Sequence, residues 1–226
     1  MPDAVGTEKT QIEIPYGIVE YTAVFKRPIF SAWANLAGFS AVVLDALSPY
    51  GFTIDGMEAK THSEKLTENA IVFRHPTAPV VTFSVGLAKT TVMAENLDWA
   101  EAEQFLATAT AGLEALKQAA NPDIQSQHVA LGIHVQLKTK SRKEVTAPLL
   151  GPAAFDLLDG DIQSQGIILQ RQKCSIIIDA SLAYANGLFI RILREHAPDA
   201  SLPDIAGVLR KDEEHVFQVL GLEGNL

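Results

Sequence analysis

The sequence predicts an α+β protein built from two units with the same order of elements. Segments with a two-residue apolar period, which is typical of strands, recur along the whole chain. Segments with helical apolar spacing separate them, and the order strand, helix, three or four strands, helix occurs twice. We therefore expect two β-α-β(3-4)-α repeats that share one antiparallel sheet, with the helices packed on one face of it.

The first half is predicted at residues 16–122, after a flexible N-terminus at residues 1–15. Its first strand, residues 18–26, carries apolar side chains on one parity and Glu20 on the other, as in a strand with one wet face. The other predicted elements of this half are a helix at residues 31–47, strands at 52–54 and 71–75, one or two strands within 80–95, and a helix that begins at Asp98 and ends near Asn121.

The helix predicted at residues 31–47 is unusual because no charged residue occurs from Pro28 to Leu44. Phe39 and Val42 lie off its main apolar stripe, so one sheet face does not cover all of its apolar groups. Either the helix that begins at Asp98 or a second protein molecule must cover the rest. We favour cover within the same chain and leave an oligomer interface open.

The second half is predicted at residues 123–226, and we expect both halves to form one compact domain. Residues 128–138 give the clearest strand pattern of the chain, with strict alternation of apolar and other side chains. The elements predicted after it are a Pro-interrupted helical segment at residues 147–158, a turn at 159–161, strands at 162–171, 173–182 and 187–194, and a helix from Ser201 to Leu220.

This order of elements resembles the duplicated fold of the TATA-binding protein family, in which each half is β-α-β4-α. The resemblance covers nearly the whole chain and consists of topology, without signature residues. It implies a fold, and it carries no function with it, because one fold hosts many functions.

Composition narrows the classes of function. The formal net charge of −9 opposes binding to the phosphate backbone of nucleic acids, which relies on lysine and arginine. Cys174 is the single cysteine, which suits a reducing compartment. The first ten residues lack the basic start and apolar run of a secretion signal, and the longest uncharged stretch is too short and too polar for a membrane span. We expect a cytoplasmic protein that does not bind membranes.

Two histidines and one basic cluster are the candidate binding residues. His128 and His134 fall on the polar face of one predicted strand, roughly 20 Å apart at about 3.3 Å per residue, so they cannot share a metal ion. They mark a solvated or groove-facing strand. The basic cluster follows the same strand and is a solvated loop or a contact for an acidic ligand, for RNA or for an acidic protein surface; it comprises Lys138, Lys140, Arg142 and Lys143.

Other motifs predict structure rather than chemistry. Residues 86–90 end like a phosphate-binding loop, but position 81 is Val where such a loop needs Gly, so a strand or hairpin is favoured. Residues 202–220 have spacing close to that of a helix-turn-helix motif, but the turn position holds Arg210, and a single amphipathic helix is favoured. Cys174 shares the parity of apolar neighbours, which predicts a buried, inert thiol.

No catalytic, metal-binding or cofactor motif is recognisable, so we predict no catalytic residue, no metal and no cofactor. The leading hypothesis is a non-catalytic binding or adaptor protein that acts through protein–protein contacts, with a homo-oligomer left open. One alternative is a nucleic-acid or nucleotide-binding regulator that uses the sheet face and the basic loop at residues 138–143. Another alternative is an enzyme whose site is assembled from distant residues.

Overall fold

The computed structural model describes residues 9–62, 64–77, 80–96, 101–149 and 166–224. The predicted α+β class is confirmed, because helices accompany one large antiparallel sheet. The arrangement as two structural repeats with all helices on one face stays a prediction. No helix in the described ranges combines the length and the apolar character needed to cross a membrane.

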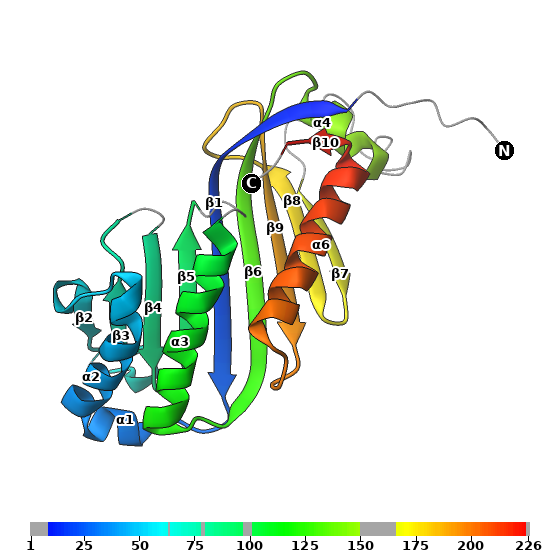
Figure 1. Cartoon of the computed structure of the whole chain (residues 1–226). Coiled ribbons are helices and arrows are strands. Elements are labelled where there is room, and N and C mark those ends of the chain that lie inside the picture. The colour runs from blue at the N-terminus through cyan, green and yellow to red at the C-terminus, as the bar shows by residue number, and fades with distance from the viewer. Residues whose placement is uncertain (1–8, 63, 78–79, 97–100, 150–165, 225–226) are drawn as a thin grey trace. The chain divides into compact units, whose positions relative to one another are not determined.

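Figure 1 shows how the strands and helices of the chain are arranged. The strands are β1 (Thr10–Phe25), β2 (Met57–Lys60), β3 (Ala70–Arg74), β4 (Val80–Gly86), β5 (Lys89–Glu95), β6 (Ile124–Leu137), β7 (Ile167–Arg171), β8 (Cys174–Ala180), β9 (Gly187–His196) and β10 (Leu222–Glu223). The helices are α1 (Phe30–Ala34), α2 (Leu36–Leu47), α3 (Ala102–Ala120), α4 (Arg142–Thr146) and α6 (Leu202–Leu220). The strand order in the sheet is β2-β3-β4-β5-β1-β6-β9-β8-β7, with β10 paired to β1.

Two compact units divide the chain, and each draws on both of the predicted halves. We call residues 18–130 and 194–206 the β2–β5 unit. We call residues 1–17, 131–193 and 207–226 the β7–β8 unit. Strands β1, β6 and β9 contribute residues to both units.

The first strand begins earlier than predicted. β1 starts at Thr10, within the stretch of residues 1–15 that was expected to be flexible, whereas the alternation indicated a start at Ile18. The early start has a long-range cause, because Thr10 and Gln11 pair in parallel register with Leu222 and Glu223 of β10. Residues 1–8 lie outside the described residues.

The helix predicted at residues 31–47 is two helices, α1 and α2, with a break at Asn35. The Asn35 side chain accepts a hydrogen bond from the Gly38 backbone N–H over 3.3 Å, which caps the start of α2. The first backbone N–H groups of a helix have no carbonyl partner within that helix. The Asn35 side chain satisfies one of them, so a new helix can begin there. Phe39 is buried in the single chain and α2 packs against α3, in agreement with cover from within the chain.

Two phenylalanines and one glycine form the centre of the β2–β5 unit, where α3 lies over the strands (Figure 1). Phe73 of β3 and Phe83 of β4 are fully buried, and their ring centroids are 6.4 Å apart. Gly112 of α3 faces Phe83 so closely that an added Cβ would lie 2.6 Å from the ring. The helix therefore approaches the sheet at a point where only glycine fits.

The segment that ends like a phosphate-binding loop is the turn of a β-hairpin. Val85 of β4 pairs with Thr90 of β5, so residues 87 and 88 connect the two strands, and no helix follows them. A phosphate loop requires the N-terminus of a helix after the loop, and that interpretation is excluded here.

In the β7–β8 unit, alternate residues of β6 and β9 are buried, as the two-residue period predicts. Helix α6 runs without interruption through residues 210–215, where a helix-turn-helix motif would have its turn, so that motif is excluded. Glu213 is buried and Glu214 pairs with Arg210 on the surface. The buried apolar residues that α6 contributes to this unit are Leu209, Val216, Phe217 and Leu220.

Several predicted features fall wholly or partly outside the described residues. They are the start of the helix at Asp98, most of the helical segment at 147–158, the turn at 159–161 and the first residues of the strand at 162–171. The strand predicted at 52–54 begins later, at Met57, after a single 3-10 turn at Ile54–Gly56.

Candidate functional site

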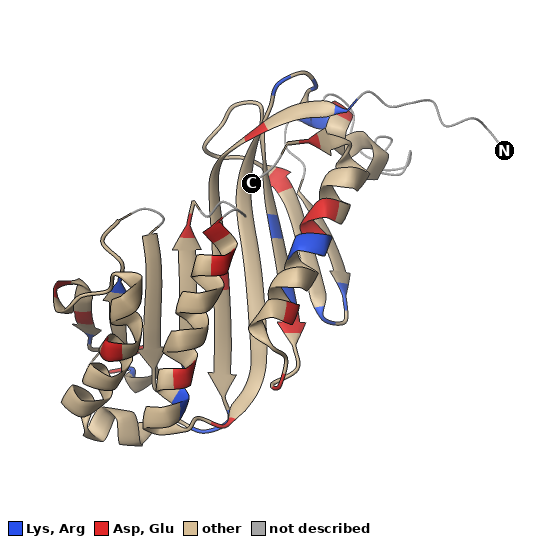
Figure 2. Ribbon diagram, in the orientation of Figure 1, with Lys and Arg blue, Asp and Glu red and all other residues tan. Residues whose placement is uncertain are grey.

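The predicted basic cluster is interleaved with carboxylates (Figure 2). The Lys138 ammonium group forms an ion pair with Glu13 of β1 and lies 3.3 Å from the side-chain oxygen of Gln136. Arg142 and Lys143 open the five-residue helix α4, whose next residue is Glu144. The cluster therefore does not present an unbroken positive surface to a phosphate backbone.

Local capping explains why Glu144 sits among the lysines. Ser141 and Glu144 form a capping box, in which the Ser141 hydroxyl oxygen accepts from the Glu144 backbone N–H over 3.3 Å. The Glu144 carboxylate accepts from the Ser141 backbone N–H over 2.8 Å and from its hydroxyl over 2.7 Å. These two hydrogen bonds, followed by the charge of Lys140, lower the pKa of Glu144. The sequence around Lys140, Arg142 and Lys143 thus starts a short helix.

The two candidate histidines belong to different compact units, His128 to the β2–β5 unit and His134 to the β7–β8 unit. His128 Nε2 lies 3.0 Å from the Ser126 hydroxyl oxygen on the same strand, and the residue is partly buried. The structure does not bring the two histidines together, as their separation along the strand predicted.

His134 is a packed histidine. The Ser181 hydroxyl oxygen accepts hydrogen bonds from the backbone N–H groups of Ala183 and Tyr184, over 3.2 and 3.1 Å. The same hydroxyl oxygen lies 2.8 Å from His134 Nδ1, with which it forms a side-chain hydrogen bond. The His134 ring centroid also lies 5.0 Å from that of Phe189, with Tyr16 and Tyr184 further out. These contacts hold the turn at Ser181 against β6.

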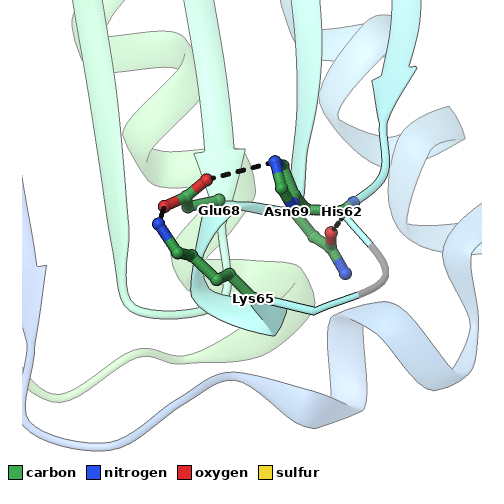
Figure 3. A network of polar contacts seen from close by, with 4 residues as sticks. All are labelled: His62, Lys65, Glu68 and Asn69. Carbon is green, nitrogen blue, oxygen red and sulfur yellow. Dashed lines mark hydrogen bonds and ion pairs between the residues drawn. The ribbon is translucent and has the colours of Figure 1, made fainter.

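Polar clusters in the described ranges do not form a metal centre, because no group of three metal-ligating side chains comes together there. Figure 3 shows a network of polar contacts in the loop between β2 and β3. Glu68 pairs with Lys65 over 2.9 Å and lies 3.5 Å from His62, and the Asn69 side chain accepts from the His62 backbone N–H. This exposed network shapes the loop.

Cys174, predicted to be buried, is partly exposed because it opens β8 beside the turn from β7.

Strand β7 is the last strand of the sheet order among the described strands, and it has apolar side chains on its surface. Ile168 is 67% exposed and Leu169 is 46% exposed, and these adjacent residues point to opposite faces of the sheet. Their partners across the β7–β8 hairpin are Ile177 and Ile176. The basic residues of the hairpin, Arg171 and Lys173, occur at its turn, and Asp179 lies near the other end of β8.

A cavity of about 570 Å³ opens within the β2–β5 unit. Strand β1, helix α3, the first residues of β6 and the segment at residues 198–203 bound it. Tyr21 and Gln127 in its wall are buried, and the Tyr21 hydroxyl donates to Gln127 Oε1 over 2.5 Å. Gln127 Nε2 donates to the carbonyl oxygens of Ala197 and Ala200, over 2.8 and 3.0 Å, and thereby fixes the segment that closes the cavity.

Burial raises the pKa of Tyr21 to about 12, so its hydroxyl is protonated at neutral pH. No histidine is among the described residues that line this cavity. Its charged side chains are Lys26, Glu114, Lys117, Asp123 and Asp199.

Sequence reasoning did not identify the cavity residues, because they come from separate parts of the chain, namely residues 21–26, Thr90, residues 110–127 and residues 198–203. One signal was present at Tyr21, which lies on the apolar parity of its strand. A buried tyrosine needs a partner for its hydroxyl, and Gln127, just before the predicted strand at 128–138, is that partner.

Comparisons with known proteins leave the family open. No protein-family model and no curated protein matches the chain. Among solved structures, a class II 3-hydroxy-3-methylglutaryl-CoA reductase from Streptococcus pneumoniae, bound to NADPH in open conformations, is 11% identical with a TM-score of 0.25; the match covers 94% of this chain and 62% of that one. Another structure of the reductase from Streptococcus pneumoniae is 11% identical with a TM-score of 0.24, covering 94% of this chain and 70% of that one. Likeness at this level carries no argument about fold or function.

Proposed function

We propose that this chain is a non-catalytic cytoplasmic binding protein that acts through protein–protein contacts, with β7 as its contact strand. The observation that carries the proposal is the exposure of Ile168 and Leu169 on an outer strand. Large exposed apolar side chains on such a strand promote aggregation when no partner covers them. Natural sheets usually protect their outer strands with charge, proline or a bulge.

The backbone of an outer strand supports the same interpretation. One side of β7 bonds to β8, and its other side is the end of the strand order among the described strands. No described strand bonds to the backbone groups on that side, and a strand added there would gain specificity from side-chain contacts on alternate residues. Arg171 adds a positive charge at the end of β7. We expect the partner to supply an extended segment with apolar residues and a carboxylate, and a second copy of this chain is one such partner.

The two alternatives have less support. A nucleic-acid or nucleotide-binding regulator would use the basic loop at residues 138–143, but Lys138 pairs with Glu13 and the chain has a net charge of −9. An enzyme would need a reactive group beside a base or an acid in a cavity, whereas the buried Tyr21 hydroxyl of the cavity donates to an amide oxygen.

The test compares Ile168→Lys with Val80→Lys in pull-downs followed by quantitative mass spectrometry. Val80 is a matched control, because it is also an exposed apolar residue on a strand, in the β2–β5 unit. The proposal predicts a partner that the parent and Val80→Lys retain and that Ile168→Lys loses. That partner, purified, should slow amide hydrogen exchange in β7.

Sedimentation of the chain alone separates the homo-oligomer from other partners. A parent larger than a monomer that becomes monomeric in Ile168→Lys identifies a second copy as the occupant. The proposal fails if the parent is monomeric and all three proteins capture the same set, or if the captured partner leaves exchange in β7 unchanged.

A further inference from the structure

We propose that the cavity of the β2–β5 unit binds an apolar small molecule that carries a protonated amine. This inference is independent of the proposed function, since the cavity and β7 lie in different compact units. It rests on three properties of the lining, which are its size and apolar character, the direction of its hydrogen bonds and the charge at its rim.

The cavity has the size and lining of a small-molecule site. Its volume of about 570 Å³ falls within the range of roughly 300–1,000 Å³ that is typical of such sites. Apolar side chains from strands, helices and the closing segment line most of it, among them Ala23, Phe25, Leu113, Leu116, Ile124 and Leu202. A ligand with an apolar body would release water from these surfaces.

The hydrogen bonds of the lining leave acceptors but few donors. Each of the four hydroxyl groups in the described lining already donates its single hydrogen to the protein. The bonds are Tyr21 to Gln127 (2.5 Å), Thr90 to the Ser84 carbonyl (2.8 Å), Thr110 to the Leu106 carbonyl (2.7 Å) and Ser201 to the Asp204 carboxylate (2.6 Å). Both hydrogens of the Gln127 amide are used as well. These side chains can therefore only accept hydrogen bonds from a ligand.

The charges at the rim favour a cation. Lys26 and Asp123 pair with each other over 3.0 Å, so they largely cancel. The remaining charged residues of the described lining are Glu114 and Lys117 of α3 and Asp199 of the closing segment. Two carboxylates against one ammonium group leave a net negative rim, which attracts a cation and repels a carboxylate ligand. A protonated amine satisfies both this rim and the acceptors inside, because it is a cation that only donates.

Three probes with the same body test the proposal: 1-adamantylamine, 1-adamantanol and 1-adamantanecarboxylate. Binding to the full chain is measured by calorimetry at pH 7, and NMR locates the perturbed residues. We expect the amine to bind about tenfold or more tightly than the carboxylate, with the alcohol between them, and to perturb Tyr21 and Gln127.

Charge-neutralising variants separate selectivity from folding. Glu114→Gln combined with Asp199→Asn should reduce the preference for the amine several-fold, while Glu103→Gln, an exposed residue of the same helix outside the lining, should not. Equal binding of the three probes, tighter binding of the carboxylate, no binding by any probe, or an unchanged preference in the double variant would each overturn the proposal. Failure of the β7 proposal would show in partner capture and leave these measurements unaffected.

Discussion

The two outer strands of the sheet, β2 and β7, are protected very differently. Strand β2 is Met-Glu-Ala-Lys, and Glu58 pairs with Arg74 of the neighbouring strand over 3.3 Å. Strand β7 is Ile-Ile-Leu-Gln-Arg and exposes Ile168 and Leu169. Charges on an outer strand disfavour the addition of another strand, because they would have to lose water or face like charges. The two strands therefore differ in the chemistry that they expose, which is charged in β2 and apolar in β7.

The strands next to these outer strands differ as well. Beside β2, the strands β3 and β4 bury Phe73 and Phe83 completely. Beside β7, strand β8 buries Ile178 but leaves Ile176 and Ile177 partly exposed. The buried phenylalanines near β2 therefore serve folding, whereas Ile168 and Leu169 of β7, unlike the buried Ile167, contribute little to it. Four predictions test this contrast, in order of decreasing effect on stability.

The largest effect is expected for Phe83→Ala. Removing a fully buried phenylalanine leaves a cavity and should lower the free energy of unfolding by about 3–5 kcal/mol. Ile168→Ala, with two thirds of its side chain already in water, should change it by less than about 0.5 kcal/mol. Urea denaturation of the isolated chain measures both. A loss of several kcal/mol in Ile168→Ala would show that β7 is part of the folding core and would weaken the contrast.

The second effect is a loss of stability at high pH that belongs to the β2–β5 unit. Burial raises the pKa of Tyr21 from 10.0 to about 12, so the native state keeps this hydroxyl protonated after the unfolded state has begun to ionise. The resulting contribution is fully present below pH 10 and is lost as the pH rises from 10 toward 12. A shift of this size corresponds to roughly 2–3 kcal/mol.

Tyr21→Phe supplies the control for the pH prediction. The variant lacks the ionisable group, so its stability should fall less steeply between pH 10 and 12 than that of the parent. Equal slopes in the parent and in Tyr21→Phe would contradict the assignment of this loss to Tyr21.

The third effect has opposite signs in two helices. Gly112 of α3 faces the Phe83 ring at a distance that leaves no room for a Cβ, so Gly112→Ala should destabilise the protein by about 1–3 kcal/mol. Gly207 of α6 has open space where a Cβ would lie, so Gly207→Ala should stabilise it by about 0.5–1 kcal/mol through helix propensity. Thermal unfolding of both variants measures the signs. Stabilisation by both would show that Phe83 can move away from α3.

The sequence predicted those elements whose periodicity is local. The alternation of residues 128–138 became β6, and the apolar stripe of the last helix became α6, because each pattern is complete within its own segment. The start of β1 at Thr10 was not predictable, since it depends on pairing with Leu222 at the other end of the chain. The break at Asn35 depends on one capping hydrogen bond that apolar spacing does not reveal.

The candidate sites were predictable to a smaller extent. Residue types located the basic cluster, but its neutralisation by Glu13 depends on β1 running beside the end of β6 within the β7–β8 unit. The cavity combines Tyr21, Gln127 and the carbonyl of Ala200, which only the folded chain brings together. The exposure of Ile168 could not be predicted either, because the sequence of an apolar strand has the same pattern in an inner and in an outer strand.

The smallest effect on stability, and the most direct test of the contrast, comes from exchanging the character of the two outer strands. Glu58→Ile with Lys60→Ile gives β2 exposed apolar residues, and both positions are exposed, so the free energy of unfolding should change by less than about 1 kcal/mol. Loss of the surface pair between Glu58 and Arg74 accounts for part of that change.

Association of the double variant should change far more than its stability, because an unprotected outer strand offers its backbone to other chains. We expect the double variant to form concentration-dependent oligomers in sedimentation experiments, and Ile168→Lys added to it should leave that new association intact. If the double variant remains as soluble and as small as the parent, apolar residues on an outer strand do not suffice for association, and the exposure of Ile168 and Leu169 loses its force as evidence for a contact strand.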